Sequence, residues 1–583
     1  MSVGAATAFA YIRQWPLRIA RQDSHWPILL GVVGLIAYLS LSPTIMLLYG
    51  SFKSEPLGVP GGLTLSNYIN VYADPVTYEL LLNSLVFAGG SSIFSVALAT
   101  ALAWITVRTN APFRRVFELS AIIPNIFPPI MMAVSWTLLL SPRIGLINRM
   151  LMGLLGLESA PLNIYSMTGM IFVEGLITAP LAFLIISGAL YSMDPALEES
   201  ARVAGSGNIQ IAWRITFPIV RPAILAAVTL NFVRAIEGFD TPAIIALPTR
   251  IEVFTTKIFR EAIGAYPPNH NVAATYAMTL LAITLFLVYV YRKLTVRTEA
   301  YVTVTGRGYR PTLVDLGRWR YAATVIAGVI LFFSAILPFI VLIYGSVVSY
   351  IHPPSPKTMS LLTTEHYAYI LTDRRTYEAF RTSLFLAITG ATLCMLLASL
   401  TAYITVKTKT VGRGAIEALT FIPWAFPGTA LAIGLLYLYI QIDLPIYATI
   451  WIILIGYITR FLPYGLRSMT STIVQIHNEL EDASKACGAG FLPTFCRILL
   501  PLMRPGFIAG WIILATIFLR EFSISVFLYT PNAEPIGPRL YHFFIDGEIG
   551  PMSSLAVIVS IVSIILIVVA RRLGKMETYY QSG

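Results

Sequence analysis

The sequence predicts an all-α polytopic membrane protein with about twelve transmembrane helices, arranged as two parallel six-helix repeats. Two observations lead to this fold class. Apolar residues make up 56% of the chain and charged residues only 12%, whereas about 25% of the residues of soluble domains are charged. Several motifs of the first half also return in the second half at nearly constant spacing. The composition requires lipid as the solvent, and the spacing indicates an internal duplication.

Each predicted span is a long apolar run. A helix needs about 20 residues to cross a hydrocarbon core of ~30 Å. The runs are continuously apolar, whereas the strands of a membrane barrel alternate over about 10 residues, so helices are favoured. The twelve runs lie near residues 27–51, 80–106, 117–140, 167–191, 223–245, 272–291, 321–348, 380–406, 416–440, 444–466, 506–528 and 553–570.

The first run follows Arg13, Arg18 and Arg21 and so resembles a secretory signal. It is too long for one, and no small-residue cleavage site follows it, so we expect a retained span. If the N-terminus is cytoplasmic, most Lys and Arg residues lie in segments on the cytoplasmic side of the membrane. Seven of them lie between residues 292 and 320. Both termini are therefore expected in the cytoplasm. The net charge of +11 then faces the anionic inner leaflet, and no nucleic-acid partner is expected.

The duplication extends over most of the chain. Residues 103–109 match residues 402–408, and residues 123–128 match residues 422–427, both 299 positions apart. Because the spacing later falls to 283, the first half carries about 16 extra residues, which we place around residues 141–162 on the outside face. Six spans is an even number, so both copies share one orientation and form a parallel repeat about an axis along the membrane normal.

The chain is thus predicted to have five parts. One of them is a basic segment that joins the two repeats and is too polar to span the membrane. The parts are a cytoplasmic N-terminal segment (1–26), a first repeat (27–293) with a cytoplasmic loop (192–222), a cytoplasmic linker (294–320), a second repeat (321–571) with a cytoplasmic loop (474–505), and a cytoplasmic tail (572–583).

The most specific motif is a polar loop that occurs in both halves, 283 residues apart. The first copy runs from Leu197 to Gly205, continues after nine residues with Ile215 and reaches Pro222. The second copy begins at Leu480 and aligns with the first without a gap. Two copies of one polar loop at matching points of two apolar halves indicate two copies of one docking surface.

Local signals predict the structure of this loop. Asp194 supplies an N-cap acceptor and Pro195 suits the first helical position. Gly205 provides the permissive backbone that ends the helix. We therefore expect a short helix, a glycine turn and a second short helix. The second copy starts with His477 and Asn478, so its first helix should be less firmly capped.

The loop resembles that of the inner-membrane permeases of binding-protein-dependent ABC importers, which reads Glu-Ala-Ala, three residues, Gly, nine residues, Ile, one residue, Leu-Pro. The departures are conservative: Ser200 and Ser484 replace Ala, Asp482 replaces Glu, and Phe217 replaces Leu. In that family the loop forms coupling helices, which dock on the ATP-binding subunit. The resemblance implies this role for Glu198, Glu199, Ala201, Arg202, Gly205, Ile215 and Pro218 in the first copy, and for Glu481, Asp482, Ser484, Lys485, Gly488, Ile498 and Pro501 in the second.

The resemblance also implies the type I ABC importer permease fold, alternating access, and a place in the bacterial inner membrane. The implied partners are two copies of an ABC ATP-binding subunit and a periplasmic substrate-binding protein. The sequence contains no Gly-x-x-x-x-Gly-Lys-Ser/Thr motif, so ATP and Mg are expected on the partner subunit. We expect no catalytic residue, cofactor or metal site in this chain. The alternative is that the loops are only amphipathic segments of a duplicated secondary transporter.

Ionisable residues inside the predicted spans are the other candidates, because a charge at bilayer depth is costly and usually faces an interior path. The fifth span carries Arg234, Glu237 and Asp240, and the eleventh carries Arg520 and Glu521. The repeat aligns Glu237 with Arg520, which suits an ion pair across the axis, and Arg234 can instead pair with Glu237 along one helix. A structural pair or gate and a direct contact with cargo both stay open.

Two further charges are weaker candidates, namely Glu174 in the fourth span and Arg460 in the tenth, which reaches toward an interface.

The cargo is less well defined than the class. The fused two-half layout, the linker around residues 302–320 and the stretch at residues 237–243 resemble the ferric-iron branch of the permease family. Relatives move polyamines, thiamine, phosphonates or phosphate esters, and these stay open. The acidic residues favour a cation, whereas the arginines suit an anion. A rival of another class is an ion-gradient-driven carrier that uses Glu237, Asp240 and Glu521 as a relay.

Overall fold

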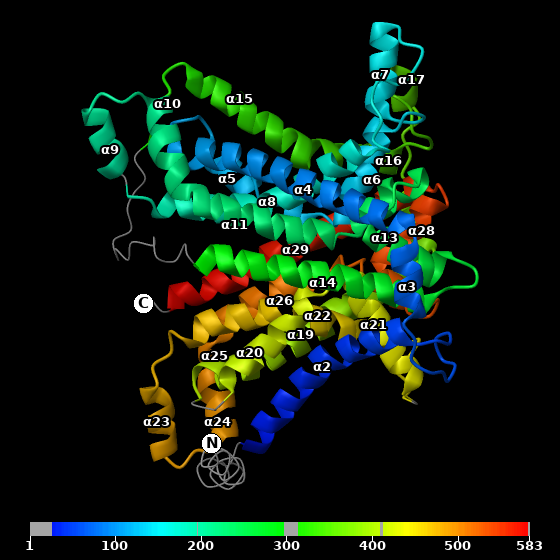
Figure 1. Ribbon diagram of the computed structural model, residues 1–583. Coiled ribbons are helices and arrows are strands. Elements are labelled where there is room, and N and C mark those ends of the chain that lie inside the picture. Colours follow the sequence, from blue (N-terminus) through cyan, green and yellow to red (C-terminus); the bar gives the residue numbers. More distant parts are fainter. Residues whose placement is uncertain (1–25, 195, 297–312, 409–411, 443, 581–583) are drawn as a thin grey trace.

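A computed structural model describes residues 26–194, 196–296, 313–408, 412–442 and 444–580. Within these ranges the chain is helical, and its only strand-like pairings are three isolated bridges. The long helices run side by side in one bundle (Figure 1). The all-α class predicted from the sequence is therefore confirmed.

Six long segments build each half. Those of the first half are α2 (Trp26–Phe52), α4 (Pro75–Ala103), the pair α5 (Arg114–Ser120) and α6 (Pro129–Leu140), α8 (Met167–Ser192), α11 (Phe217–Ile236) and α14 (His270–Val296). Those of the second half are α15 (Trp319–Leu331) continued by α16 (Leu337–Val347), α19 (Arg374–Val406), the pair α20 (Arg413–Phe421) and α21 (Gly428–Gln441), α22 (Ile450–Ile473), α26 (Arg504–Leu519) and α29 (Ile549–Tyr580).

The described helices agree with most of the twelve predicted runs, but α11 ends at Ile236 and α26 at Leu519, before the predicted span ends at residues 245 and 528. Eight of them are long and apolar enough to cross a membrane, or up to eleven when each of three bent pairs counts as one span. The remaining run corresponds to α22, a helix of 24 residues. It carries two arginines, Arg460 and Arg467.

Two predicted continuous spans are broken in the middle, which corrects the sequence prediction for residues 117–140 and 416–440. The chain bends by 99° between α5 and α6 and by 103° between α20 and α21. Each bend contains two prolines, at 124 and 128 in the first half and at 423 and 427 in the second. Proline removes a helical hydrogen bond and clashes with the preceding turn, so both copies break at the same point of the repeat.

The extra residues of the first half form a helix of their own. Between α6 and α8 the chain builds α7 (Leu146–Leu155), whereas only residues 442–449 separate α21 from α22. In Figure 1, α7 lies at the end of the bundle that also holds α3 (Ser66–Ala73), α17 (Pro356–Met359) and α28 (Ile536–Ile545). The two repeated loops lie at the opposite end.

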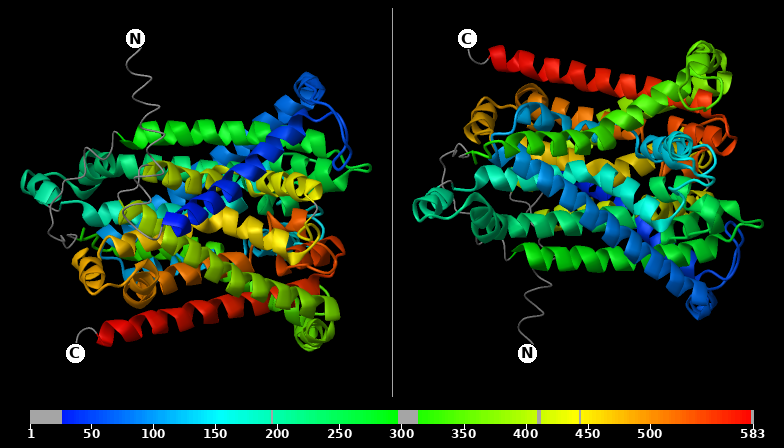
Figure 2. Two further views of the ribbon diagram at one scale, coloured as in Figure 1. Left: turned by 90° about the horizontal axis from the view of Figure 1, so that it is seen from below. Right: turned by 90° about the horizontal axis from the view of Figure 1, so that it is seen from above.

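The two halves interlock through their first spans. α2 packs on α20 and α21 of the second half, and α15 packs on α4 and α5 of the first half. Figure 2 shows α2, in dark blue, crossing the neighbouring helices obliquely. The contact is close at Gly434 of α21, where a Cβ atom would lie 2.4 Å from the carbonyl oxygen of Pro43 in α2. Small residues permit such an approach between helices in a membrane.

The interlock predicts that Gly434→Val lowers the melting temperature of the purified protein in detergent. The added side chain must push α2 away from α21, which costs about 1–3 kcal/mol by overpacking. Gly31→Val in α2 is the matched control, because a Cβ atom there meets nothing within 4 Å. Equal melting temperatures for the two variants would contradict this account of the contact.

Candidate functional site

Both repeated loops have the predicted structure. The first forms α9 (Ala196–Val203) and α10 (Asn208–Ile211), and the second forms α23 (Glu479–Ala486) and α24 (Phe491–Thr494). The glycines between the helices, Gly205 and Gly488, have φ values of +85° and +76°. This left-handed backbone is strained for any residue with a side chain, which explains why glycine occupies both turns.

The starts of the two loops differ as expected. Oδ1 of Asp194 accepts a hydrogen bond of 2.9 Å from the backbone N–H of Ala196, at the start of α9. In the second loop the side-chain oxygen of Asn478 instead accepts a bond of 2.6 Å from Nζ of Lys407. The second loop is thus held by a lysine from the end of α19.

A buried ion pair fixes the first loop to its own half. Glu198 of α9 is 1% exposed and pairs with Arg108, which is 0% exposed and ends the long helix begun by α4. Oγ1 of Thr216 donates a second bond of 2.6 Å to Glu198. A buried charge is tolerated when it is paired and hydrogen-bonded. The acidic residue therefore connects α9 firmly to the second span.

The second loop repeats this arrangement with weaker contacts. Glu481 of α23 lies 3.5 Å from Nζ of Lys407, and the hydroxyl of Tyr403 donates a bond of 3.3 Å to the same carboxylate. Lys407 and Arg108 are 299 residues apart, and Glu481 and Glu198 are 283 apart, so both pairs occupy equivalent positions of the repeat. The duplication therefore preserved an ion pair that the sequence analysis did not identify.

Glu198 and Glu481 are both buried, and their carboxylates pair with Arg108 and Lys407 inside the protein. The role in coupling to a partner subunit that the family resemblance implies for them stays a prediction. The outer surface of the loops instead presents apolar side chains, with Val203 90% exposed and Leu197 and Leu480 also exposed. An exposed apolar side chain on a short helix suits a contact with another protein.

The other predicted loop residues occupy different depths. Ser484 is buried, and its hydroxyl forms a hydrogen bond of 2.8 Å with that of Thr494. The side chain of Lys485 lies outside the described part of the chain. Those that are exposed are Glu199, Gly205, Pro218, Asp482, Gly488 and Pro501, and those that are half-buried are Ala201, Arg202, Ile215 and Ile498.

The charges predicted inside the membrane form a cluster between the two halves. Arg460 of α22 lies at its centre, with one guanidinium nitrogen 3.8 Å from Glu237 of the first half and another 3.9 Å from Glu521 of the second. Arg460 and Glu174 were the weaker candidates in the sequence, yet the cluster contains both. Oε2 of Glu174 accepts a bond of 2.7 Å from Thr241.

The predicted ion pair between Glu237 and Arg520 does not form, nor do Arg234 and Glu237 form an ion pair in the described structure. Arg520 instead donates to backbone carbonyls at the break between α5 and α6, namely to Asn125 and, at 3.0 Å, to Phe127. A broken helix leaves carbonyls without partners where no water is available, and a guanidinium offers five donors to satisfy them. The bend in the third span thus determines where Arg520 points.

Equivalent residues of the two halves touch each other in this cluster. The rings of Phe239 and Phe522 stack with centroids 5.5 Å apart, and the hydroxyl of Ser523 donates a bond of 3.3 Å to Asp240. Each of these pairs is 283 residues apart. Equivalent groups meet only near the axis that relates the halves, so these contacts mark its position. Phe239 is 0% exposed and Phe522 1%, which closes the axis here.

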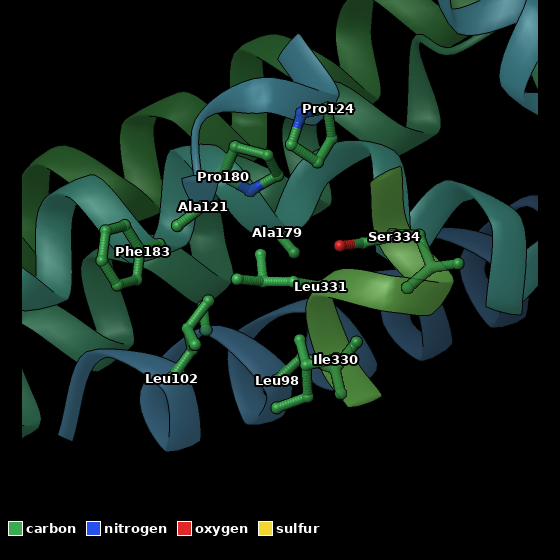
Figure 3. A pocket seen from close by; sticks show the side chains of 12 residues that line it. Leu98, Leu102, Ala121, Pro124, Ala179, Pro180, Phe183, Ile330, Leu331 and Ser334 are labelled. Carbon is green, nitrogen blue, oxygen red and sulfur yellow. The ribbon is translucent and has the colours of Figure 1, made fainter. Parts of the chain in front are cut away.

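A separate apolar cavity lies between α4, α8 and the start of the second half (Figure 3). Its lining includes Leu98, Pro124, Pro180 and Ile330, and Ser334 contributes its polar side chain. Both prolines of this lining stand at special points of the chain, Pro180 inside α8 and Pro124 at the break before α6. A lining with so few polar groups is unsuited to an ionic cargo.

The chain matches one family model in both halves. The family is the binding-protein-dependent transport system inner membrane component, and the matches cover residues 93–298 and 390–576. Together these ranges span more than half of the chain, and each contains one repeated loop. Among the described residues, no group of three or more His, Cys, Asp or Glu is placed to hold a metal ion.

Similar curated proteins cover most of the chain. The ferric transport system permease protein FbpB of Actinobacillus pleuropneumoniae is 27% identical over 532 residues, which is 90% of this chain and 74% of the relative. The putative ferric transport system permease protein FbpB 1 of Haemophilus influenzae is 25% identical and covers 92% of this chain and 82% of its own length.

Other similarities cover one half. The spermidine/putrescine permease PotC of Escherichia coli is 24% identical over 38% of this chain and 83% of its own length. The crystal structure of a bacterial ABC transporter that imports alginate matches 50% of this chain and 99% of its own, with 22% identity and a TM-score of 0.39.

The ion pair of the first loop predicts that Glu198→Gln destabilises the protein strongly. The guanidinium of Arg108 stays buried without a counter-charge, which costs about 3–5 kcal/mol. Glu481→Gln should cost less, because Lys407 keeps two other oxygen acceptors. Thermal melting of the purified protein measures both losses. Glu158→Gln, which removes a carboxylate at an exposed position, is the control. A melting temperature for Glu198→Gln equal to that of the control would refute the anchoring role.

Proposed function

The chain belongs to the family of binding-protein-dependent transport system inner membrane components, and we propose that it is the permease of an importer for ferric iron. The general class, the membrane subunit of an ABC importer in a fused two-half form, follows from the two family matches. The observation that carries the proposal of iron is the extent of the similarity. The proteins named as ferric transport permeases align over about nine-tenths of the chain, whereas the spermidine/putrescine permease aligns with 38% of it.

Two ATP-binding subunits are the proposed motor. The two loops lie at one end of the bundle, and α9 and α23 sit at opposite edges of that end (Figure 1). The exposed leucines Leu197 and Leu480 are equivalent in the repeat and would contact two copies of one partner, and the first loop adds exposed Val203. The sequence has no phosphate-binding loop, so ATP and Mg would bind to that partner. This end would then face the cytoplasm, with both termini inside.

The contacts on the axis support alternating access. Stacked Phe239 and Phe522 close the path while the two loops stand apart. When ATP draws the partner subunits together, each loop would move with the span to which Arg108 or Lys407 connects it. A periplasmic binding protein would deliver its cargo at the opposite end, where α3, α7 and α28 lie.

The buried cluster is the proposed contact for the cargo. Glu237 reaches Arg460 only at 3.8 Å, and its Oε1 has no hydrogen-bond partner within the described structure. Glu521 lies 3.9 Å from Arg460 and accepts bonds of 2.8 and 3.1 Å from the backbone N–H groups of Ile524 and Ser525. Carboxylates from both halves beside a closed axis suit a cation with a high charge density. Arg460 would neutralise them while no cargo is present.

The proposed motor contact predicts that Gly205→Val uncouples transport from ATP hydrolysis. Valine at φ +85° costs about 1–2 kcal/mol and displaces the turn between the two short helices. Gly488→Val should act in the same way at φ +76°. The control is Gly207→Val, where a Cβ atom meets nothing within 4 Å and φ is not positive. Radioactive iron uptake and ATPase activity in proteoliposomes measure the effect. Normal uptake by both turn variants would contradict the assignment of the loops as the contacts with the ATP-binding subunits.

Purification of the intact importer tests the function itself. We expect an ATPase chain at a ratio of about 2:1 to this protein, and a binding protein whose ligand is ferric iron by mass spectrometry. A polyamine, thiamine or a phosphorus compound as that ligand would keep the importer class and overturn the cargo. Uptake that survives loss of the ATPase but collapses with the proton gradient would instead establish an ion-gradient-driven carrier.

A further inference from the structure

The segment that leads into the second half lies against the end of the first half. The backbone N–H of Val314 donates a bond of 2.8 Å to the carbonyl of Arg108, and its carbonyl accepts one of 3.2 Å from Asn110. Val314 is buried, and it forms a parallel bridge with Thr109. Arg108 ends the second span of the first half, and Thr109 and Asn110 follow it. We refer to residues 314–317 as the linker clip.

Side chains fix the register of this contact. Nδ2 of Asn110 donates a bond of 2.6 Å to Oδ1 of Asp315, while Oδ1 of Asn110 accepts one of 3.1 Å from the backbone of Leu316. The N–H of Gly317 donates a third bond, of 2.9 Å, to Asp315. The bonds from Gly317 and Asn110 hold the pKa of Asp315 below its ordinary value, so this exposed carboxylate is ionised at neutral pH.

The linker clip also touches the first repeated loop. Nδ2 of Asn208, the first residue of α10, donates a bond of 3.2 Å to the carbonyl of Asp315. Arg108, whose carbonyl binds Val314, carries the side chain that pairs with Glu198 of α9. Both short helices of this loop are thus connected to the linker clip, α10 directly and α9 through one residue. Figure 1 shows α10 close to the start of α15.

The linker clip continues without a break into the second half. The N–H of Trp319, at the start of α15, donates to the carbonyl of Leu316 at 3.0 Å. α15 packs on α4 and α5, and its continuation α16 packs on α29 of the second half. A displacement of the first loop therefore has a hydrogen-bonded route to the second half, in addition to the packing between spans.

We propose that Asp315 and Asn110 are positioning residues that hold the first coupling loop and pass its movement to the second half through the linker clip. The linker then does more than join two permease halves. This inference rests on the proposed motor contact of the loops. It assigns the linker clip a mechanical role that depends on side chains and not on the covalent join alone.

The test compares Asp315→Ala, Asn110→Ala and the double variant in the intact importer, reconstituted in proteoliposomes with its ATPase and loaded binding protein. The readout is the amount of cargo transported per ATP hydrolysed. Both single variants remove the bond between Asn110 and Asp315, and each also removes one further bond, from Leu316 or from Gly317. Loss of the shared bond, at ordinary strength, should lower this ratio about three- to tenfold. The double variant should lose less than the sum of the two single losses, because both single variants remove the bond between Asn110 and Asp315.

Three controls separate this role from simple destabilisation. Asp315→Asn keeps an acceptor oxygen for Asn110 and Gly317, so most of the ratio should return. Arg318→Ala changes an exposed neighbour of the linker clip and should behave as the unaltered protein. Melting temperatures and complex yields should be similar for all variants. Unchanged ratios in both single variants, or losses that add in the double variant, would overturn the inference. An unaltered importer that shows no ATP-coupled transport would instead refute the proposed function.

Discussion

The absence of water in the bilayer interior is the constraint on which the rest of this structure depends. Every backbone carbonyl released by a bend needs a donor, and every charge needs a partner. The break between α5 and α6 therefore receives the guanidinium of Arg520 from the other half. At the end of the bundle that holds the repeated loops the protein interior itself excludes water, and buried Arg108 is paired there with Glu198. Each of these contacts also joins two segments that are distant in the sequence, so satisfying the constraint builds the connections that transport requires.

The class of fold was readable from the sequence because it depends on composition and spacing. The apolar runs gave the spans to within a few residues in most cases, and the repeated loops were predicted down to the glycine turns. The broken spans were missed, although Pro124, Pro128, Pro423 and Pro427 stand at equivalent positions in the two halves. An apolar run indicates that a segment lies in lipid, whereas a bend depends on whether a neighbouring helix supplies donors to the freed carbonyls.

The charged residues were identified more reliably than their partners. Glu237, Asp240 and Glu521 do gather between the halves, but Glu237 meets Arg460 and not its repeat equivalent Arg520. Alignment of the repeats identifies residues at equal depth in the membrane. Which of them pair depends on where their side chains point, and Arg520 points to the break between α5 and α6. The basic residues that anchor the loops, Arg108 and Lys407, stood in a recognised repeat motif. Their shared positive charge could have indicated a shared acidic partner.

The hydrogen bond between Ser523 and Asp240 joins two equivalent positions of the repeat that hold different residues. A symmetric dimer of one half would place the same residue on both sides of the axis, so an aspartate there would face a second aspartate at close range. Two neighbouring carboxylates without water repel each other and force one to hold a proton. In one polypeptide the two equivalent positions can hold different residues, so a serine hydroxyl faces Asp240 where a symmetric dimer would place a second carboxyl group.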